Sequence, residues 1–174
     1  MQIEELNEKS IIRDLLRPLK EGHSVGLLSE AGCPAVADPG AALVEAAHQC
    51  GIRVVPLVGP SSILLALMAS GLEGQRFAFC GYLPRDAGER RKRIQELQAR
   101  SSRERETQIF IETPYRNDAL LASLLEVLAE ETRLCVATDL TLPTEAIRTQ
   151  SVRSWRSSHR AIGKRPTIFL LLSG

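Results

Sequence analysis

The sequence lacks the long apolar segment that a membrane-spanning helix of ~20 residues requires. Its longest apolar candidate, Ile168 to Leu172, has the length of a strand. The first residues carry Glu4, Glu5 and Glu8, which is not the pattern of a secretory signal. Aromatic residues make up 4% of the chain, so a protein that binds single strands by base stacking would have few rings to offer. We expect no membrane partner.

The sequence also lacks the residue spacing of a metal site. Its four cysteines, Cys33, Cys50, Cys80 and Cys135, form no pair with the spacing of metal ligands, and its three histidines are scattered. A chain of 174 residues with 44% hydrophobic residues is large and apolar enough to fold without disulfides. We therefore expect reduced thiols in a cytoplasmic protein, and no metal.

Acidic residues are missing from the C-terminal part of the chain. No Asp or Glu follows Glu145, although the net charge of the whole chain is only +1. Such an asymmetry indicates an anionic partner such as RNA for the basic segment. A solvated loop that balances acids elsewhere on the surface is the alternative. The basic residues of this segment are Arg148, Arg153, Arg156, Arg160, Lys164 and Arg165.

The remaining chain alternates between helical and strand patterns, which predicts an α/β architecture of two lobes. Residues 1–75 are expected to form a parallel α/β lobe, and residues 76–174 a second lobe. The late strands of the second lobe follow one another closely, so its sheet is expected to be mixed. Strands are expected at 24–29, 52–58, 77–82, 107–112, 133–139, 145–149 and 167–173, and helices at 3–21, 40–50, 63–70, 87–101 and 117–130.

Three loops follow predicted strands, at residues 29–40, 59–62 and 112–117. Ligands of open α/β sheets bind outside the carboxyl ends of the strands. Gly32 leaves room for a close backbone approach, and the helix that begins at Ser61 offers unpaired N–H groups. Asp38-Pro39 has the simpler interpretation of a helix N-cap followed by proline, and Ser61 can likewise serve only as a cap. No GxGxxG or P-loop pattern is present.

Several segments of the sequence have the form of motifs. They are Leu28 to Pro34 with Asp38-Pro39-Gly40, Pro56 to Ser62, Arg76-Phe77 with Gly81 to Pro84, Ile109 to Glu112 with Arg116, and Leu140-Thr141 with Glu145. In this order they resemble the motifs of the tetrapyrrole (corrin/porphyrin) methylase superfamily. The similarity is greatest to its ribosomal RNA small subunit methyltransferase I branch, and it extends from about residue 20 to the C-terminus.

The resemblance implies two α/β lobes that hold S-adenosyl-L-methionine in the cleft between them, and a homodimer. It also implies that the chain is N-terminally truncated, because the family opens with a strand and a glycine-rich loop before the first helix found here. The family's RNA-binding C-terminal region is also absent, Cys33 replaces its threonine and Leu142 its lysine. The cofactor contacts that the resemblance implies are Ala31, Gly32, Cys33, Val36, Ser61, Ser62, Glu112 and Pro166.

Methyl transfer from a sulfonium is an in-line displacement, so catalysis depends mainly on positioning and on exclusion of water. If the acceptor is an RNA ribose hydroxyl, a base must take its proton. Glu112, Asp139 and Glu145 are the expected bases, with Arg116 as an anion-holding partner. The same carboxylates can also be plain surface or capping groups. Two other functions stay open, namely a tetrapyrrole-type small-molecule methylase and an inactive dimerising or binding fragment.

Overall fold

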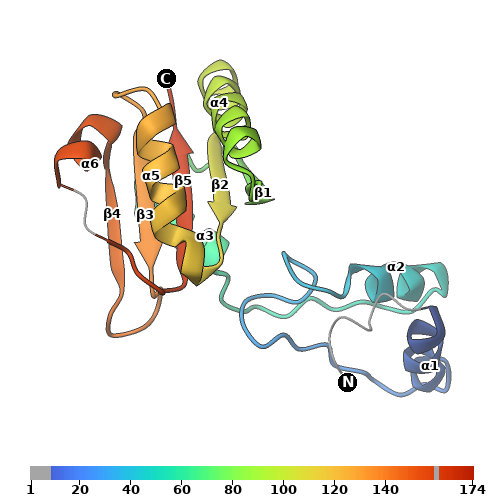
Figure 1. Ribbon diagram of the computed structural model, residues 1–174. Coiled ribbons are helices and arrows are strands. Elements are labelled where there is room, and N and C mark those ends of the chain that lie inside the picture. Colours follow the sequence, from blue (N-terminus) through green and yellow to red (C-terminus); the bar gives the residue numbers. More distant parts are fainter. Residues whose placement is uncertain (1–8, 159–160) are drawn as a thin grey trace. The chain divides into compact units, whose positions relative to one another are not determined.

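The computed structural model in Figure 1 describes residues 9–158 and 161–174. The chain consists of two compact units, Met1–Ser61 and Ser62–Gly174. The first unit contains the helices α1 (Lys9–Lys20) and α2 (Ala41–Gln49), and the second begins with α3 (Ser62–Ser70).

The second unit contains the strands and helices that the sequence predicts for it, with ends that differ by a few residues. The short helices η2 and α6 were not predicted. The further elements of this unit are β1 (Phe77–Tyr82), α4 (Ala87–Glu104), β2 (Thr107–Ile111), η2 (Pro114–Arg116), α5 (Asn117–Val127), β3 (Arg133–Thr138), β4 (Ala146–Ser151), α6 (Val152–Ser158) and β5 (Thr167–Leu172).

The five strands form one mixed sheet in the order β1-β2-β5-β3-β4. β1 pairs with β2 in parallel, and the other three pairs are antiparallel. The mixed sheet expected for this half of the chain is therefore confirmed. β5 is the central strand, and its apolar sequence Thr167–Leu172 fits a strand that is covered on both faces.

Helices cover both faces of this sheet, so the unit has three layers. α4, α5 and α6 pack on the face that carries Phe169 and Leu171 of β5, and α4 and α5 are seen over it in Figure 1. α3 packs on the opposite face, against Ile168 and Leu170. The alternation along β5 follows from the two-residue period of a strand.

The boundary between the units differs from the seam expected between residues 75 and 76. α3 belongs to the second unit because Ile63, Ala66 and Leu67 are buried in the apolar cluster on the sheet. The hydroxyl of Thr149 in β4 also donates to the carbonyl oxygen of Ser70 at 2.7 Å. An apolar helix contributes most where it can bury its side chains, and the sheet provides that surface.

In the first unit, α1 and α2 pack around a small core of Leu16, Leu43 and Ala47. Pro18 lies inside α1, which continues to Lys20. The sequence predicted a break or kink near this proline, and the helix ends two residues beyond it.

Two strands expected in the first unit are not present. The segments 24–29 and 52–58 contain no strand, so the prediction of a parallel sheet in this half is wrong for the described residues. Val55 and Leu57 are 56% and 85% exposed, and Leu28 is 85% exposed. A strand exists only when its backbone pairs with a neighbour, and the β-like composition of these segments does not supply one.

The predicted N-cap at Asp38 is also wrong. α2 begins at Ala41, and its N-cap is Gly40, with a φ of 136° and no side-chain cap. A Cβ at position 40 would lie 2.8 Å from Leu27 Cδ2. The positive φ therefore favours glycine at this position, and a larger residue would also have to displace the end of the Leu27 side chain.

We expect Leu170→Ala to lower the free energy of unfolding by about 2–5 kcal/mol, because it leaves a cavity at a fully buried position in the central strand. The same change at Leu64, which is 50% exposed on α3, is the matched control and should cost far less. Urea unfolding measures both. Equal losses would show that β5 is not the centre of the core.

Candidate functional site

One edge of the sheet brings together the residues that follow β2 and β3 and those that precede β4 and β5. The register pairs Ile111 with Ile168, and Thr138 with Thr167 and Ala146. The carboxyl ends of β2 and β3 therefore lie at the amino ends of β5 and β4. The predicted residues Glu112, Asp139, Glu145 and Pro166 come directly after or before these strand ends.

Glu112 is buried at this edge, with 1% of its side chain exposed, and it forms an ion pair with Arg116. Its other carboxylate oxygen accepts hydrogen bonds from the backbone N–H of Thr113 at 2.7 Å and from the hydroxyl of Thr113 at 3.3 Å. A buried carboxylate needs such partners. Because both oxygens are engaged, Glu112 holds the turn that carries η2 and is poorly placed to take a proton.

Asp139 joins two loops at the same edge. Its Oδ2 accepts hydrogen bonds from Arg165 Nε at 2.7 Å and from the hydroxyl of Thr144 at 2.8 Å. The hydrogen bonds from Arg165 and then from Thr144 hold the pKa of the Asp139 carboxyl below its ordinary value. Arg165 also donates to the carbonyl oxygen of Thr144. Asp139 therefore remains ionised and links the loop before β5 to the loop before β4.

Glu145 is the exposed carboxylate of the three. Its Oε2 accepts a hydrogen bond from the backbone N–H of Thr141 at 2.7 Å. The side chain lines an open, mainly apolar cavity of about 320 Å³ within the second unit. Glu145 is thus the predicted base that a ligand at this edge can reach. The other lining residues are Leu65, Met68 and Ala69 of α3, and Leu140, Thr141 and Ile147.

Asn117 and Asp118, at the start of α5, hold the segment before β5, and the sequence analysis missed both. The Asn117 amide donates to the carbonyl oxygens of Gly163 at 3.2 Å and Arg165 at 2.7 Å. The Asp118 carboxylate accepts from the backbone N–H of Ile162 at 2.6 Å. Within the part of the chain that the structure describes, Asn117 Oδ1 is a buried acceptor without a partner. The only sequence signal was two polar residues before an apolar helix.

The two glycine- and proline-rich loops of the first unit meet at Cys33. Its Sγ lies 3.4 Å from the carbonyl oxygen of Pro60 and 3.9 Å from that of Gly59. Gly32 has a φ of 76°, and nothing lies within 4 Å of a Cβ built there, so its backbone faces open space. The two loops are therefore neighbours within the first unit.

The predicted cofactor residues are divided between the two units. Ala31, Gly32, Cys33, Val36 and Ser61 belong to the first unit, and Ser62, Glu112 and Pro166 belong to the second.

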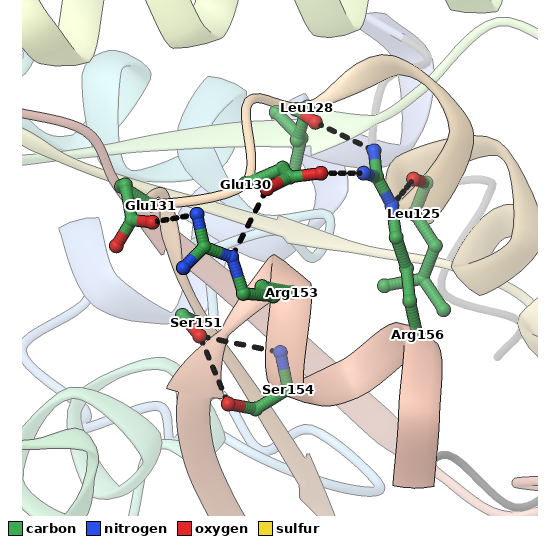
Figure 2. A network of polar contacts seen from close by, with 8 residues as sticks. All are labelled: Leu125, Leu128, Glu130, Glu131, Ser151, Arg153, Ser154 and Arg156. Carbon is green, nitrogen blue, oxygen red and sulfur yellow. Dashed lines mark hydrogen bonds and ion pairs between the residues drawn. The ribbon is translucent and has the colours of Figure 1, made fainter.

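The basic C-terminal segment is largely engaged in contacts with its own unit (Figure 2). Arg153 pairs with Glu130 at 3.0 Å and with Glu131 at 2.7 Å. Arg156 donates to the carbonyl oxygens of Leu125 at 2.8 Å and Leu128 at 3.2 Å, and it pairs with Glu130 at 3.2 Å. These two arginines tie α6 to the end of α5.

Other basic residues of the segment are also occupied. The Arg148 guanidinium lies 5.2 Å from the centre of the Trp155 ring, and Arg165 pairs with Asp139. Arg160 lies outside the described residues. The segment is therefore not the free basic patch that its composition indicated. Lys164 differs, since it makes no ion pair with any of the residues described.

Within residues 9–158 and 161–174, no helix has the length and apolar character needed to cross a membrane. The same ranges contain no group of three or more His, Cys, Asp or Glu side chains that could hold a metal ion.

The sequence pattern of the family described as Tetrapyrrole (Corrin/Porphyrin) Methylases matches residues 2–154. Ribosomal RNA small subunit methyltransferase I of Mesorhizobium japonicum is 41% identical over 84% of this chain and 49% of its own length. The protein of the same name from Neisseria meningitidis serogroup B is 36% identical over 94% of this chain and 54% of its own. The chain thus spans about half the length of the curated relatives it matches.

Solved structures share the fold at lower sequence identity. A diphthine synthase matches 99% of this chain and 68% of its own, with a TM-score of 0.70 and 17% identity. Uroporphyrin-III C-methyl transferase from Thermus thermophilus, in complex with S-adenyl homocysteine, matches 95% and 73%, with a TM-score of 0.54 and 17% identity.

We expect Arg156→Ala to lower the free energy of unfolding by roughly 1–3 kcal/mol, because charged hydrogen bonds to two carbonyl oxygens are lost. Arg153→Ala removes only exposed ion pairs and should cost about 0–1 kcal/mol. Chemical denaturation compares the two variants. A larger cost for Arg153→Ala would contradict the conclusion that, of the two arginines whose contacts Figure 2 shows, Arg156 contributes more to stability.

We expect the Asp139 interactions to make the second unit sensitive to acid. Because folding lowers the pKa of this carboxyl, its contribution is present above the unfolded pKa of about 3.9 and is lost as the pH falls through the lower folded value. The stability of Asp139→Asn should therefore fall less steeply in this acidic range. Urea midpoints at a series of pH values test this, and identical slopes for both proteins would refute it.

Proposed function

The chain belongs to the tetrapyrrole (corrin/porphyrin) methylase family, and we propose that it is an S-adenosyl-L-methionine-dependent methyltransferase acting on ribosomal RNA. The observation that carries this proposal is the gathering of Glu112, Asp139, Glu145 and Pro166 at one sheet edge. These residues come from the three loops that follow β2, connect β3 with β4 and precede β5.

The residues present fit such a cofactor. In the second unit, the buried Asn117 Oδ1 lacks a donor among the described residues, beside the segment that contains Pro166. An adenine amino group is a donor of the required kind. In the first unit, Ala31 and Gly32 are small and exposed, so the backbone of their loop is accessible. We propose that Ala31, Gly32, Cys33, Val36, Ser61, Ser62, Glu112 and Pro166 hold the cofactor.

S-adenosyl-L-methionine supplies an activated methyl group, so the chain needs no covalent nucleophile. The protein has to orient the acceptor and accept its proton. We propose that Glu145 is the base that accepts this proton, because Glu112 and Asp139 are engaged in ion pairs with Arg116 and Arg165. Arg116 then serves to keep the Glu112 turn in place.

The acceptor and the assembly are also proposals. Curated relatives that are 35–41% identical carry the name of a ribosomal RNA methyltransferase, which supports an RNA ribose hydroxyl as the acceptor. Four free thiols support a cytoplasmic location. The exposed side chains of Leu28, Leu57 and Met68 support a homodimer, since apolar groups of this size favour a covering partner.

Calorimetric titration with S-adenosylhomocysteine tests the proposed function. We expect saturable binding by the unchanged chain. Ala31→Phe places a bulky ring in the exposed loop and should abolish this binding without unfolding the protein. Ala99→Phe, an equally bulky change on the exposed face of α4, is the matched control and should bind normally.

Two results would contradict the proposal. One is the absence of any saturable heat in the unchanged chain while circular dichroism shows it to be folded. The other is equal binding by Ala31→Phe and Ala99→Phe, which would place the cofactor away from the loop of residues 31–36.

A further inference from the structure

Both tyrosines of the chain are exposed at the same sheet edge as the candidate site. Tyr115 is 79% exposed and lies in η2, three residues after Glu112. Tyr82 is 61% exposed at the carboxyl end of β1, paired in parallel with Ile111 of β2. Phe110, Phe169 and Trp155 are instead buried in the core. A chain with few aromatic residues therefore presents two of them to solvent at one place.

Tyr115 also carries a cation on its ring. The ammonium of Lys164 lies 4.9 Å from the centre of the Tyr115 ring, and this lysine side chain is exposed. Arg153, Arg156 and Arg165 are neutralised by carboxylates, whereas Lys164 pairs with no carboxylate of the described chain. Its charge is therefore available to an anion from outside.

We propose that Tyr115 and Lys164 form a binding site for one nucleotide of single-stranded RNA, with the base stacked on the tyrosine ring and the phosphate held by the lysine. The identification of RNA as the ligand rests on the proposed function. Aromatic rings stack with every base, because each base has a flat π-face. An ammonium offers three donors to phosphate oxygens.

Hydrogen bonds and an ion pair hold the backbone next to Tyr115 and next to Lys164. This favours binding, because little conformational entropy is lost when a ligand binds to segments that are already ordered. Tyr115 is followed by Arg116, whose ion pair with the buried Glu112 closes the η2 turn. Lys164 lies between Gly163 and Arg165, whose carbonyl oxygens both accept from the Asn117 amide. The two side chains thus belong to anchored segments at the same sheet edge as Glu145, the proposed base.

The test measures the binding of a fluorescein-labelled, single-stranded oligoribonucleotide of mixed sequence to the full chain by fluorescence anisotropy at low salt. Tyr115→Ala should weaken binding roughly 5- to 150-fold, the range found for loss of one base stack. Tyr115→Phe keeps the stacking ring and should bind like the unchanged chain. A thermal unfolding measurement on each variant is the control for correct folding.

The charge is tested by salt dependence. Lys164→Ala should reduce the slope of log affinity against log salt by about 0.7, as expected for one phosphate contact to a single strand. Lys92→Ala removes an exposed lysine from α4 and is the matched control, which should leave the slope unchanged.

Two results would overturn the proposal directly, namely no RNA binding at low salt, or equal affinities of the Tyr115→Ala and Tyr115→Phe variants for RNA. A carboxylated porphyrin, which is also a flat anion, serves as a competing ligand. The proposal is likewise overturned if Tyr115→Ala weakens the binding of the porphyrin but not that of RNA. Titration of the same samples with S-adenosylhomocysteine separates this proposal from the proposed function. Cofactor binding without RNA binding rejects only the nucleotide site. RNA binding through Tyr115 without cofactor binding supports the nucleotide site and rejects the methyltransferase.

Discussion

The antiparallel pairing of β5 with both β2 and β3 is the constraint on which the second unit depends. β5 comes last in the sequence, yet it is the central strand, and it is buried on both faces. Because it runs against its two neighbours, its first residues lie beside their last ones. Glu112, Asp139 and Pro166 therefore lie at the same edge of the sheet, although they are far apart in the sequence.

Side chains at this edge turn the arrangement into a fixed frame. Arg165 joins the loops before β4 and β5 through Asp139 and Thr144, and Asn117 holds the segment before β5 from the other side. Buried polar groups that are paired in this way keep their positions, since separating them leaves unsatisfied charges or amides. Such pairing commits two of the three predicted carboxylates to structure and leaves Glu145 accessible.

Strands were predictable from sequence where their partners lie in the same unit. The apolar run of β5 and the patterns of β1 to β3 indicated strands, and each one finds a partner in the sheet. Residues 24–29 and 52–58 carry equally β-like sequences but form no strand, because pairing depends on a neighbour that local composition does not reveal. Packing also decides to which unit α3 belongs, since its buried side chains lie against the sheet of the second unit.

The site could be predicted only in part. The sequence identified Glu112, Asp139 and Glu145, the first two by their positions at strand ends. It did not show which of them would be engaged, because the contacts with Arg116, Arg165 and Thr144 form only in the folded chain. Charge composition was informative only in part as well. The basic segment indicated a polyanion partner, but not that Arg153, Arg156 and Arg165 fasten α6 and the loop before β5.

The central claim is that a methyl-donor cofactor binds at the edge where β2 and β3 end and β5 begins. Nuclear magnetic resonance of the isotope-labelled chain, titrated with S-adenosylhomocysteine, tests this most directly. The account predicts that backbone amide shifts change for Glu112, Asp139 and Thr167. Changes confined to the opposite edge of the sheet, near Arg133 and Leu172, would contradict it.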